Sequence, residues 1–257
     1  MVRGFDVFRR RFAGPEDRYV LIGGTAVDIA MDDAGLRFRA TKDLDIVLHV
    51  ESLDVEFARL FWAFVEDGRY KYRQKSTGKT QLFRFYEPED PAFPYIIELF
   101  SRMPDLIEAP ADSHLTPLPI SEEVSSLSAI LLDNDYYEFV QQGTRFEHGL
   151  SVLAPEYIVA LKARACIDLV ARRDQGEEVS GDDIKKHRGD IIRLTQLIPP
   201  TERIALPESI RGDMIDFMAA ALDEGAGPRE LGVVGMTMES VKALLVSVYG
   251  LGPLSSE

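Results

Sequence analysis

Two aspartates spaced two residues apart are the side chains of this sequence with the clearest chemical potential. Asp43 and Asp45 lie in the stretch 42–50, where alternating polar and apolar residues predict a strand. Residues two apart in a strand share one face, with Cα atoms about 6.5–7 Å apart. Two such carboxylates repel each other unless a cation lies between them, and hard oxygen ligands suit Mg²⁺. The pair therefore indicates a metal-binding strand, although an exposed edge strand gives the same pattern.

A glycine pair precedes the aspartates. Gly23 and Gly24 follow the short apolar stretch 19–22 and precede a helix-forming stretch, with Thr25 next in the chain. Glycines between a strand and a helix let backbone N–H groups approach a phosphate, and the partial positive charge of the helix N-terminus favours an anion. Thr25 can add a hydroxyl. The pattern predicts a phosphate-binding turn, and a plain tight turn is the alternative.

A third carboxylate lies inside a later apolar stretch. Glu98 stands between Ile97 and Leu99 in the predicted strand 95–102. A buried carboxylate without a partner is costly, so its position needs a cation or contact with water. Glu98 is therefore either a third metal ligand or a glutamate that faces water from a strand edge.

The elements that must position these residues follow from the apolar periodicity. Strands and helices alternate up to about residue 150, and helices alone follow. We therefore expect two domains, an α/β domain over residues 1–150 and a helical domain over residues 151–257. The predicted strands cover 19–22, 42–50, 80–88 and 95–102, with further strand and loop material over 103–150, including 129–143. The predicted helices cover 5–18 (with its end around 13–17), 25–35 (with Gly35 as its stop), 51–68, 154–173, 180–198 (with a weak capping-box pattern at Ser180 and Asp183), 207–225 and 237–250.

The composition is that of an ordinary globular protein. The chain has 257 residues, of which 46% are apolar and 28% charged, and it has no apolar run long enough to span a membrane. The N-terminal stretch lacks the apolar centre of a signal peptide, and the single cysteine, Cys166, rules out an intrachain disulfide. We therefore expect a cytoplasmic protein with no membrane partner, in which Cys166 has a packing role. The net charge of −14 opposes nucleic-acid binding by charge alone and favours a cationic substrate.

Together, the glycine turn and the aspartate pair resemble the signature of the nucleotidyltransferase superfamily, which has the polymerase-β-like fold. That signature is an apolar strand, a Gly-Gly or Gly-Ser turn, a short helix, and Asp-x-Asp or Asp-x-Glu on the next strand. The resemblance implies an α+β fold, in which a mixed sheet flanked by helices forms the nucleotidyltransferase catalytic domain and a helical C-terminal domain follows. It also implies a nucleoside triphosphate as substrate and two Mg²⁺ ions as cofactor. The matching residues are Gly23, Gly24, Thr25, Asp43 and Asp45.

Glu98 matches the third carboxylate of the superfamily, since it lies between apolar residues on a later predicted strand. The resemblance therefore implies that Asp43, Asp45 and Glu98 hold the metal ions and that Glu98 helps to deprotonate an acceptor hydroxyl. Two-metal catalysis of this kind needs no protein nucleophile.

The spacing Arg39-x-Thr41-x-Asp43-x-Asp45 resembles the AbiEii/AbiGii branch, the nucleotidyltransferase toxins of abortive-infection systems. This resemblance implies a cognate antitoxin as a partner. The nucleotide-binding residues that it implies in this half of the chain are Gly23, Gly24, Thr25, Arg39 and Thr41.

The helical half of the chain matches this branch at two further residues. The resemblance implies that Lys162 contacts the nucleoside triphosphate and neutralises charge on the leaving pyrophosphate, a role that suits a compact ammonium. It implies that Asp190 lies in the nucleotide-binding site and orients Lys162. The alternative for Lys162 is a side chain that extends from an apolar stripe to water.

The sequence departs from the superfamily in two places. The separation of Gly24 from Asp43 is longer than in compact members, and His187 stands where many members have an acid. The resemblance covers roughly residues 19–197, strongest at 22–46.

The residues leave the acceptor open. An RNA or protein acceptor, which the toxin branch implies, needs a basic rim near the site. A small cationic acceptor also fits, because the stretch 22–46 is similar to the aminoglycoside nucleotidyltransferases. A non-catalytic nucleotide-binding or partner-binding module on the same fold is the third possibility. Residues 76–80 contain Gly-Lys-Thr but lack the upstream glycine of a phosphate-binding loop, so a polar hairpin turn is favoured there. The most basic cluster, formed by Lys71, Arg73, Lys75 and Lys79, could contact a nucleic-acid substrate, and a solvated turn is favoured over that role.

Overall fold

The structure is a computed structural model of the chain, and it describes residues 3–14, 18–39, 41, 43–48, 55–76, 81–101, 130 and 133–252, without the side chains of residues 72–76, 81, 82 and 101. The chain falls into two compact units: Met1–Leu132 with Val140–Ala154, and Asp133–Phe139 with Pro155–Glu257. The predicted domain boundary lies at residues 150 and 151, whereas the units meet between Ala154 and Pro155. Among the residues described, no helix combines the length and the apolar character needed to cross a membrane.

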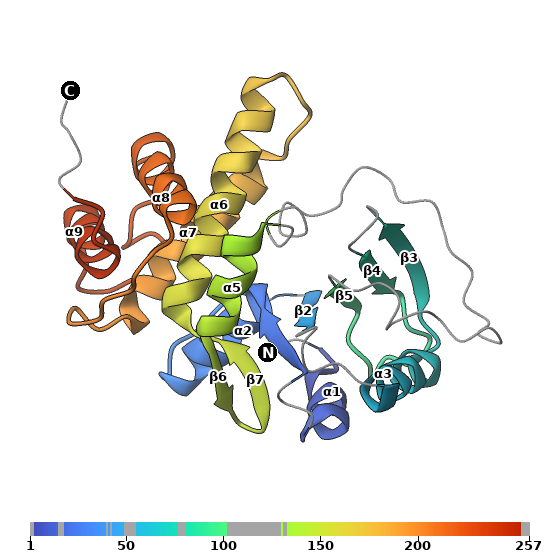
Figure 1. Cartoon of the computed structure of the whole chain (residues 1–257). Coiled ribbons are helices and arrows are strands. Elements are labelled where there is room, and N and C mark those ends of the chain that lie inside the picture. Colours follow the sequence, from blue (N-terminus) through green and yellow to red (C-terminus); the bar gives the residue numbers. More distant parts are fainter. Residues whose placement is uncertain are drawn as a thin grey trace. The chain divides into compact units, whose positions relative to one another are not determined.

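A mixed sheet forms the first unit (Figure 1). Its described strands are β1 (Tyr19–Ile22), β2 (Asp43–Leu48), β3 (Lys71–Ser76), β4 (Gln81–Tyr86), β5 (Ile96–Ser101), β6 (Thr144–Glu147) and β7 (Leu150–Leu153). Their order in the sheet is β3-β4-β5-β2-β1-β7-β6. The pairs β2–β5 and β1–β7 are parallel, and the other neighbouring strands are antiparallel. The sheet therefore places the acidic strand β2 at its centre, between β1 and β5.

Helices precede, connect and follow these strands. They are α1 (Phe5–Phe12), α2 (Gly23–Asp33), α3 (Val55–Gly68), α5 (Asn134–Gln142), α6 (Pro155–Asp174), α7 (Gly181–Leu194), α8 (Glu208–Ala220) and α9 (Met238–Tyr249), with a 3₁₀ turn η2 (Thr195–Leu197) after α7. The predicted α+β fold class is confirmed, since a mixed sheet flanked by helices is followed by a helical part of the chain.

The first helix ends earlier than the prediction of 5–18. Ala13 already has an extended backbone, with ψ of 116°, and Gly14 has φ of 125°. That φ is open to glycine and strained for other residues, and Pro15 behind it has no N–H to donate to a helix. The helix therefore ends at Phe12, immediately before the stretch 13–17 around which its end is predicted.

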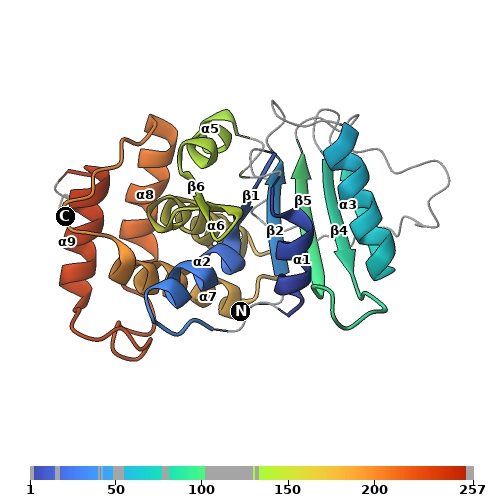
Figure 2. The same ribbon diagram turned by 90° about the horizontal axis from the view of Figure 1, so that it is seen from below.

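The helices α1 and α3 cover one face of the sheet with aromatic side chains (Figure 2). The rings of Phe8 and Phe64 join the two helices, with 5.9 Å between their centroids. Tyr19 of β1 stacks on the ring of Phe57 in α3 at 6.1 Å. Phe83 and Phe85 of β4 lie on this face too, since their rings contact α3. Burial of these aromatic groups on one side leaves the opposite face of the same strands for other residues.

The helix α2 is fixed at both ends, and it carries the glycine turn at its start. Gly35 follows its last turn with φ of 68°, which confirms the predicted stop. Asp33 contacts His148, whose Nε2 lies 2.8 Å from Oδ1, in the turn between β6 and β7. The edge of the sheet is therefore joined to the C-terminal end of α2.

The helix α5 (Asn134–Gln142) lies where strand and loop material was predicted, whereas the strand β6 and the start of β7 agree with that prediction for the end of the stretch 103–150. Tyr136, Phe139 and Val140 are buried and follow the spacing of one helix face. The prediction was wrong because aromatic and β-branched residues favour strands when tertiary contacts are ignored. The remainder of the stretch predicted before it, up to residue 129, lies outside the described residues.

Capping in the second unit differs from the sequence pattern. Ser180 precedes α7 but makes no capping hydrogen bond through its side chain, so the predicted capping box there is wrong. Thr237 and Ser240 form a capping box at α9 instead. At the end of α8, the buried Arg188 donates from Nε to the carbonyl oxygen of Leu222 at 2.9 Å. Leu222 is itself buried and follows the last residue of α8 by two, so this bond satisfies a buried carbonyl oxygen in the turn after the helix.

Candidate functional site

The glycine turn lies directly against the acidic strand. Gly23 has φ of 65°, and a Cβ at this residue would stand 1.9 Å from Oδ2 of Asp45. A Cβ at Gly24 would stand 2.5 Å from Oγ1 of Thr41. Both separations are far shorter than any real carbon contact. The two glycines therefore have a steric role in the packing of β2, whether or not a phosphate contacts them.

The first turn of α2 begins at the glycine pair, without a polar residue at the N-cap position. Ile22 is the N-cap residue and makes no capping hydrogen bond, and the first turn contains no acidic residue. The first N–H groups of a helix have no partner inside the helix, and they favour an anion. The end of α2 at Gly23 therefore has the chemistry expected of a phosphate-binding turn.

Thr25 uses its hydroxyl inside the protein. Its Oγ1 donates to the carbonyl oxygen of Asp43 at 2.9 Å, and the side chain is buried. A hydroxyl has a single proton, so this bond leaves only the lone pairs of Oγ1 available. Contact of Thr25 with a phosphate stays a prediction, and it would use the backbone N–H of this residue as the donor.

Arg39 and Thr41 lie between the turn and the acidic strand. The guanidinium of Arg39 lies over the ring of Phe38, 5.0 Å from its centroid, and the side chain is half-buried. Thr41 packs against Gly24, as the close approach of its Oγ1 shows. The motif from Arg39 to Asp45 therefore contacts the glycine turn through Thr41. Contact of Arg39 and Thr41 with a nucleotide stays a prediction.

The register of the parallel pair β2–β5 brings the three carboxylates to one face. Asp45 is opposite Glu98, and Asp43 is opposite Ile96. Neighbours in register share a face, as do residues two apart in one strand. Asp43, Asp45 and Glu98 therefore project from the same side of the sheet, opposite the aromatic groups of α1 and α3. We name this side, defined by these three residues, the acidic face.

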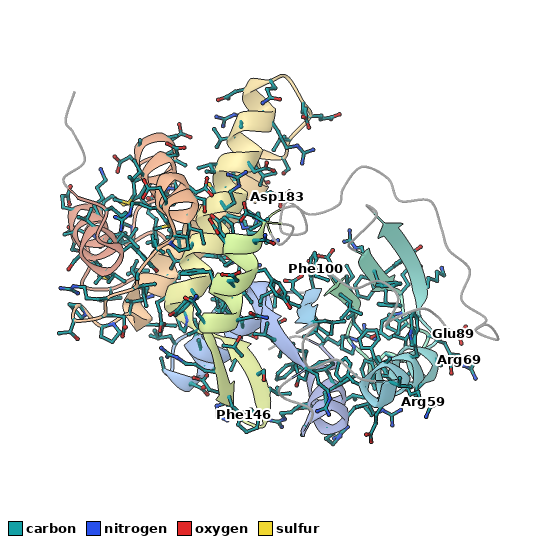
Figure 3. The ribbon with its side chains drawn as sticks, in the orientation of Figure 1. Arg59, Arg69, Glu89, Phe100, Phe146 and Asp183 are labelled. Atoms are coloured by element: carbon teal, nitrogen blue, oxygen red, sulfur yellow. The ribbon has the colours of Figure 1, made fainter. Side chains whose placement is uncertain are left out.

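Burial differs among the three carboxylates. Asp45 and Glu98 are 8% and 5% exposed, whereas Asp43 is half-buried. Glu98 lies on a central strand rather than an edge, so the alternative of an edge glutamate facing water is excluded. Phe100, labelled in Figure 3, follows Glu98 by two residues on the same face and is itself buried. Apolar surroundings raise the cost of an unpaired charge at Glu98.

Glu98 has a basic neighbour. Arg84 of β4 is directly opposite Glu98 in the antiparallel pair β4–β5, and its Nε lies 3.4 Å from Oε1 of Glu98. The side chain of Arg84 is 32% exposed and that of Glu98 is 7% exposed. A guanidinium keeps its charge at any pH that the protein meets. The acidic face therefore contains a permanent positive charge beside Glu98, the most buried of its three carboxylates.

The acidic face has the donor chemistry of a divalent-metal site. Carboxylate oxygens are hard ligands, and Mg²⁺ binds through one or two of them together with phosphate oxygens and water. In the part of the chain that the structure describes, however, no three His, Cys, Asp or Glu side chains are arranged to hold a metal ion. The residue types and their common face thus fit Mg²⁺. In this structure, Glu98 forms an ion pair with Arg84. Metal binding stays a prediction.

Lys162 and Asp190 meet inside the second unit. Lys162 of α6 donates from Nζ to Oδ2 of Asp190 in α7 at 2.8 Å, and these residues are 4% and 0% exposed. Asp190 also lies 3.6 Å from a guanidinium nitrogen of Arg193, through Oδ1. The predicted pairing of Asp190 with Lys162 is therefore present, and Lys162 does not extend to water. Contact of either residue with a nucleotide stays a prediction.

A comparison with solved structures finds a distant likeness. The structure is similar to that of an antigenic nucleotidyltransferase-like protein from Paracoccidioides brasiliensis, with 15% sequence identity, coverage of 90% of this chain and 85% of that chain, and a TM-score of 0.34. No protein-family model matches the chain, and no curated protein is similar to it in sequence. The likeness is too distant to transfer residues, so the site rests on the geometry of this chain.

Two basic residues near the predicted site residues were not found from the sequence. Arg84 stands between two phenylalanines of β4, and a cation between aromatic residues of a strand was the signal that could have revealed it. Arg193 follows Asp190 by three residues, which is the spacing of neighbours on a helix face. Neither partner was predictable without the register of β4 with β5 or the packing of α6 on α7.

Proposed function

We propose that the chain is a Mg²⁺-dependent nucleotidyltransferase that moves a nucleoside monophosphate group from a nucleoside triphosphate to an acceptor hydroxyl. One observation carries the proposal: the contact of Gly23 with Asp45 and the register of Asp45 with Glu98 bring a phosphate-type turn and three carboxylates together. A helix N-terminus beside clustered carboxylates suits a triphosphate held with a divalent cation.

In the proposed reaction, the acceptor oxygen attacks the α-phosphorus in line. The bond from the acceptor oxygen to that phosphorus forms, and the bond to the bridging oxygen breaks, so pyrophosphate leaves with the electron pair. Glu98 takes the proton of the acceptor hydroxyl, since a carboxylate within reach is a suitable general base. The backbone N–H groups from Gly23 to Thr25 hold the phosphates, and Lys162, oriented by Asp190, offsets charge on the pyrophosphate.

Mg²⁺ would be held by Asp43 and Asp45, with Glu98 as the third carboxylate, and when bound it would neutralise charge on the triphosphate. The spacing from Arg39 to Asp45 is the feature that favours the AbiEii-type toxin branch within the superfamily, with RNA as the acceptor and a cognate antitoxin as a partner. Arg39 and Thr41 then contribute to nucleotide binding from the segment that packs on the glycine turn.

A second acceptor class is favoured by one observation. The net charge of −14 attracts a small polycation such as an aminoglycoside and repels RNA over long distances. RNA binding would then depend on local basic groups. A labelled nucleoside triphosphate distinguishes the two acceptors, because the label then appears either in RNA or in the small molecule.

The test is incubation with Mg²⁺ and each of the four α-labelled nucleoside triphosphates, with total RNA in one arm and an aminoglycoside in the other. We expect label to enter one acceptor with the wild-type protein and to be lost with Asp43→Asn/Asp45→Asn, which keeps the side-chain shapes. Retention of fold by the variant is checked by circular dichroism. Label transfer that survives the double substitution would contradict the assignment, and binding of nucleotide without any transfer would favour the non-catalytic module.

A further inference from the structure

Arg84 is the residue of the acidic face that the proposed reaction does not use. It lies on the neighbouring strand to Glu98, on the same face, and the two side chains form an ion pair at 3.4 Å. Its backbone is held from the other side, because Phe83 and Phe85 on either side of it are buried and pack against Trp62 of α3. The backbone at Arg84 is therefore held by packing on the opposite face, and a change of partner by Arg84 needs a rotation of its side chain alone.

The acidic face brings three carboxyl groups together. Asp43, Asp45 and Glu98 project from one side of adjacent strands, and two of these residues are more than nine-tenths buried. Like charges in apolar surroundings destabilise one another, and a buried carboxylate that loses its partner destabilises the fold. Arg84 places a positive charge at the end of this group that is farthest from the glycine turn, on the strand beyond β5.

We propose that Arg84 is an internal counter-ion of the acidic face and that it competes with a divalent cation for Glu98. This inference rests on the metal site of the proposed function and concerns the regulation of that site. When Glu98 is paired with Arg84, it is oriented toward β4; when Glu98 turns to a cation shared with Asp45, the pair with Arg84 is lost. Because each partner weakens the binding of the other, removal of Arg84 strengthens metal binding.

The exposure of Arg84 allows this exchange. About a third of its side chain reaches water, whereas Glu98 is almost fully buried. A released guanidinium can therefore be hydrated at the surface while its aliphatic stem stays on the strand. A fully buried arginine could not leave its partner at so low a cost.

The test is the affinity of the full chain for Mn²⁺, measured by electron paramagnetic resonance of the free ion, without nucleotide. We expect Arg84→Gln to bind Mn²⁺ about fivefold or more tightly than the wild type, since couplings of this kind span about 5- to 150-fold. We also expect the variant to melt at a lower temperature without metal and to gain more thermal stability from Mn²⁺. Arg69→Gln is the matched control, because Arg69 pairs with Glu89 at 2.9 Å on the exposed surface of the same unit. It should leave Mn²⁺ affinity unchanged.

A second variant separates competition from a general change of charge. In Arg84→Gln/Glu98→Gln, the contested carboxylate is absent, so the gain in Mn²⁺ affinity should disappear. If Arg84→Gln does not fold, Arg84→Lys replaces it, and its weaker monodentate pair should still tighten Mn²⁺ binding.

The outcomes separate this inference from the proposed function. Wild-type binding of Mn²⁺ with no gain in Arg84→Gln or Arg84→Lys overturns the role of Arg84 and leaves the nucleotidyltransferase proposal standing. Tighter binding in the variants without any nucleotide transfer by the wild type supports the role of Arg84 and counts against the proposed reaction. Absence of Mn²⁺ binding in every form overturns the role of Arg84 together with the metal site.

Discussion

Oδ2 of Asp45 lies 1.9 Å from the point where a Cβ of residue 23 would stand, so the acidic strand can meet this turn only at a glycine. The neighbouring contacts repeat the relationship, since Gly24 faces Thr41 and Thr25 bonds to the carbonyl oxygen of Asp43. Three consecutive residues of the turn thus contact three alternate residues of the motif that leads into β2. These contacts hold the two sequence motifs against each other.

Substitution of Gly23 by alanine is expected to destabilise the protein by about 2–4 kcal/mol, from the overlap with Asp45 together with the left-handed backbone. Gly35→Ala is the matched control, because Gly35 has a similar φ of 68° but open space around it. It should cost about 1 kcal/mol. Urea denaturation of the two variants measures the difference, which reports the steric contact alone.

The same contact predicts a compensating pair. Asp45→Ala removes the atoms that a methyl group at residue 23 would overlap, so Gly23→Ala should cost less in that background than in the wild type. Equal costs in both backgrounds would show that the contact between Gly23 and Asp45 is absent in solution.

Lys162→Met is expected to lower the free energy of unfolding by about 3–5 kcal/mol, because it leaves the carboxylate of Asp190 buried with a weaker partner in Arg193. The double variant Lys162→Met/Asp190→Leu should return to within about 1 kcal/mol of the wild type, since apolar groups can replace a buried ion pair. Both free energies come from urea denaturation.

This double variant also separates structure from chemistry. If Lys162 offsets charge on the pyrophosphate, the double variant should be stable but unable to transfer label from a nucleoside triphosphate. A stable double variant with wild-type transfer would restrict the pair to a structural role.

Tyr136→Phe is expected to destabilise the second unit by about 1–2 kcal/mol. The hydroxyl of Tyr136 donates to Oδ2 of Asp213 at 2.7 Å, and Arg164 binds the other oxygen of the same carboxylate. Burial and the bond to Asp213 raise the pKa of Tyr136 above its ordinary value, so the hydroxyl remains a donor across the neutral range. Hydrogen exchange should show faster opening of residues 134–139, where α5 begins.

Tyr95→Phe serves as the comparison for this variant, because Tyr95 is 39% exposed. Loss of the Tyr95 hydroxyl should leave the free energy of unfolding and the hydrogen exchange of α5 unchanged. If Tyr136→Phe behaved in the same way, the bond to Asp213 would have no role in holding α5.

Cys166 is expected to resist thiol reagents in the native protein. Burial raises the pKa of its thiol to about 11, and the residue is fully buried. At pH 8, about one molecule in a thousand would carry the reactive thiolate. Titration with an aromatic disulfide reagent should give no reaction until urea unfolds the chain, when one thiol per chain should react. Stoichiometric reaction of the folded protein would contradict the burial of Cys166, and Cys166→Ser provides the blank.

The raised pKa of Cys166 makes the stability of the protein depend on pH. Below pH 9.0, the ordinary pKa of the thiol, the group is protonated in both the folded and the unfolded chain and does not change the free energy of unfolding. Stability falls as the pH rises from about 9 to about 11, since the unfolded chain releases the proton first. In Cys166→Ser, the free energy of unfolding should fall less between pH 9 and pH 11 than in the wild type.

The sequence by itself determined the local features of this protein. The apolar runs and their periodicity fixed the positions of β1, β2, β4, β5 and most helices, because burial of one face is written into the order of the residues. The glycine turn and the aspartate spacing likewise follow from local geometry, since neighbours two apart in a strand share a face whatever surrounds them. The sequence did not reveal that residues 134–142 form a helix, because that choice depends on tertiary burial.

Only the tertiary structure decided which distant residues meet. The register of β2 with β5 placed Glu98 beside Asp45, and the register of β4 with β5 placed Arg84 beside Glu98. The packing of α6 on α7 joined Lys162 to Asp190. None of these pairs has a local signal, because strand order and helix packing are set by how whole apolar faces fit together rather than by spacing along the chain. The residue types of the candidate site are therefore a property of the sequence, and its charge balance is a property of the fold.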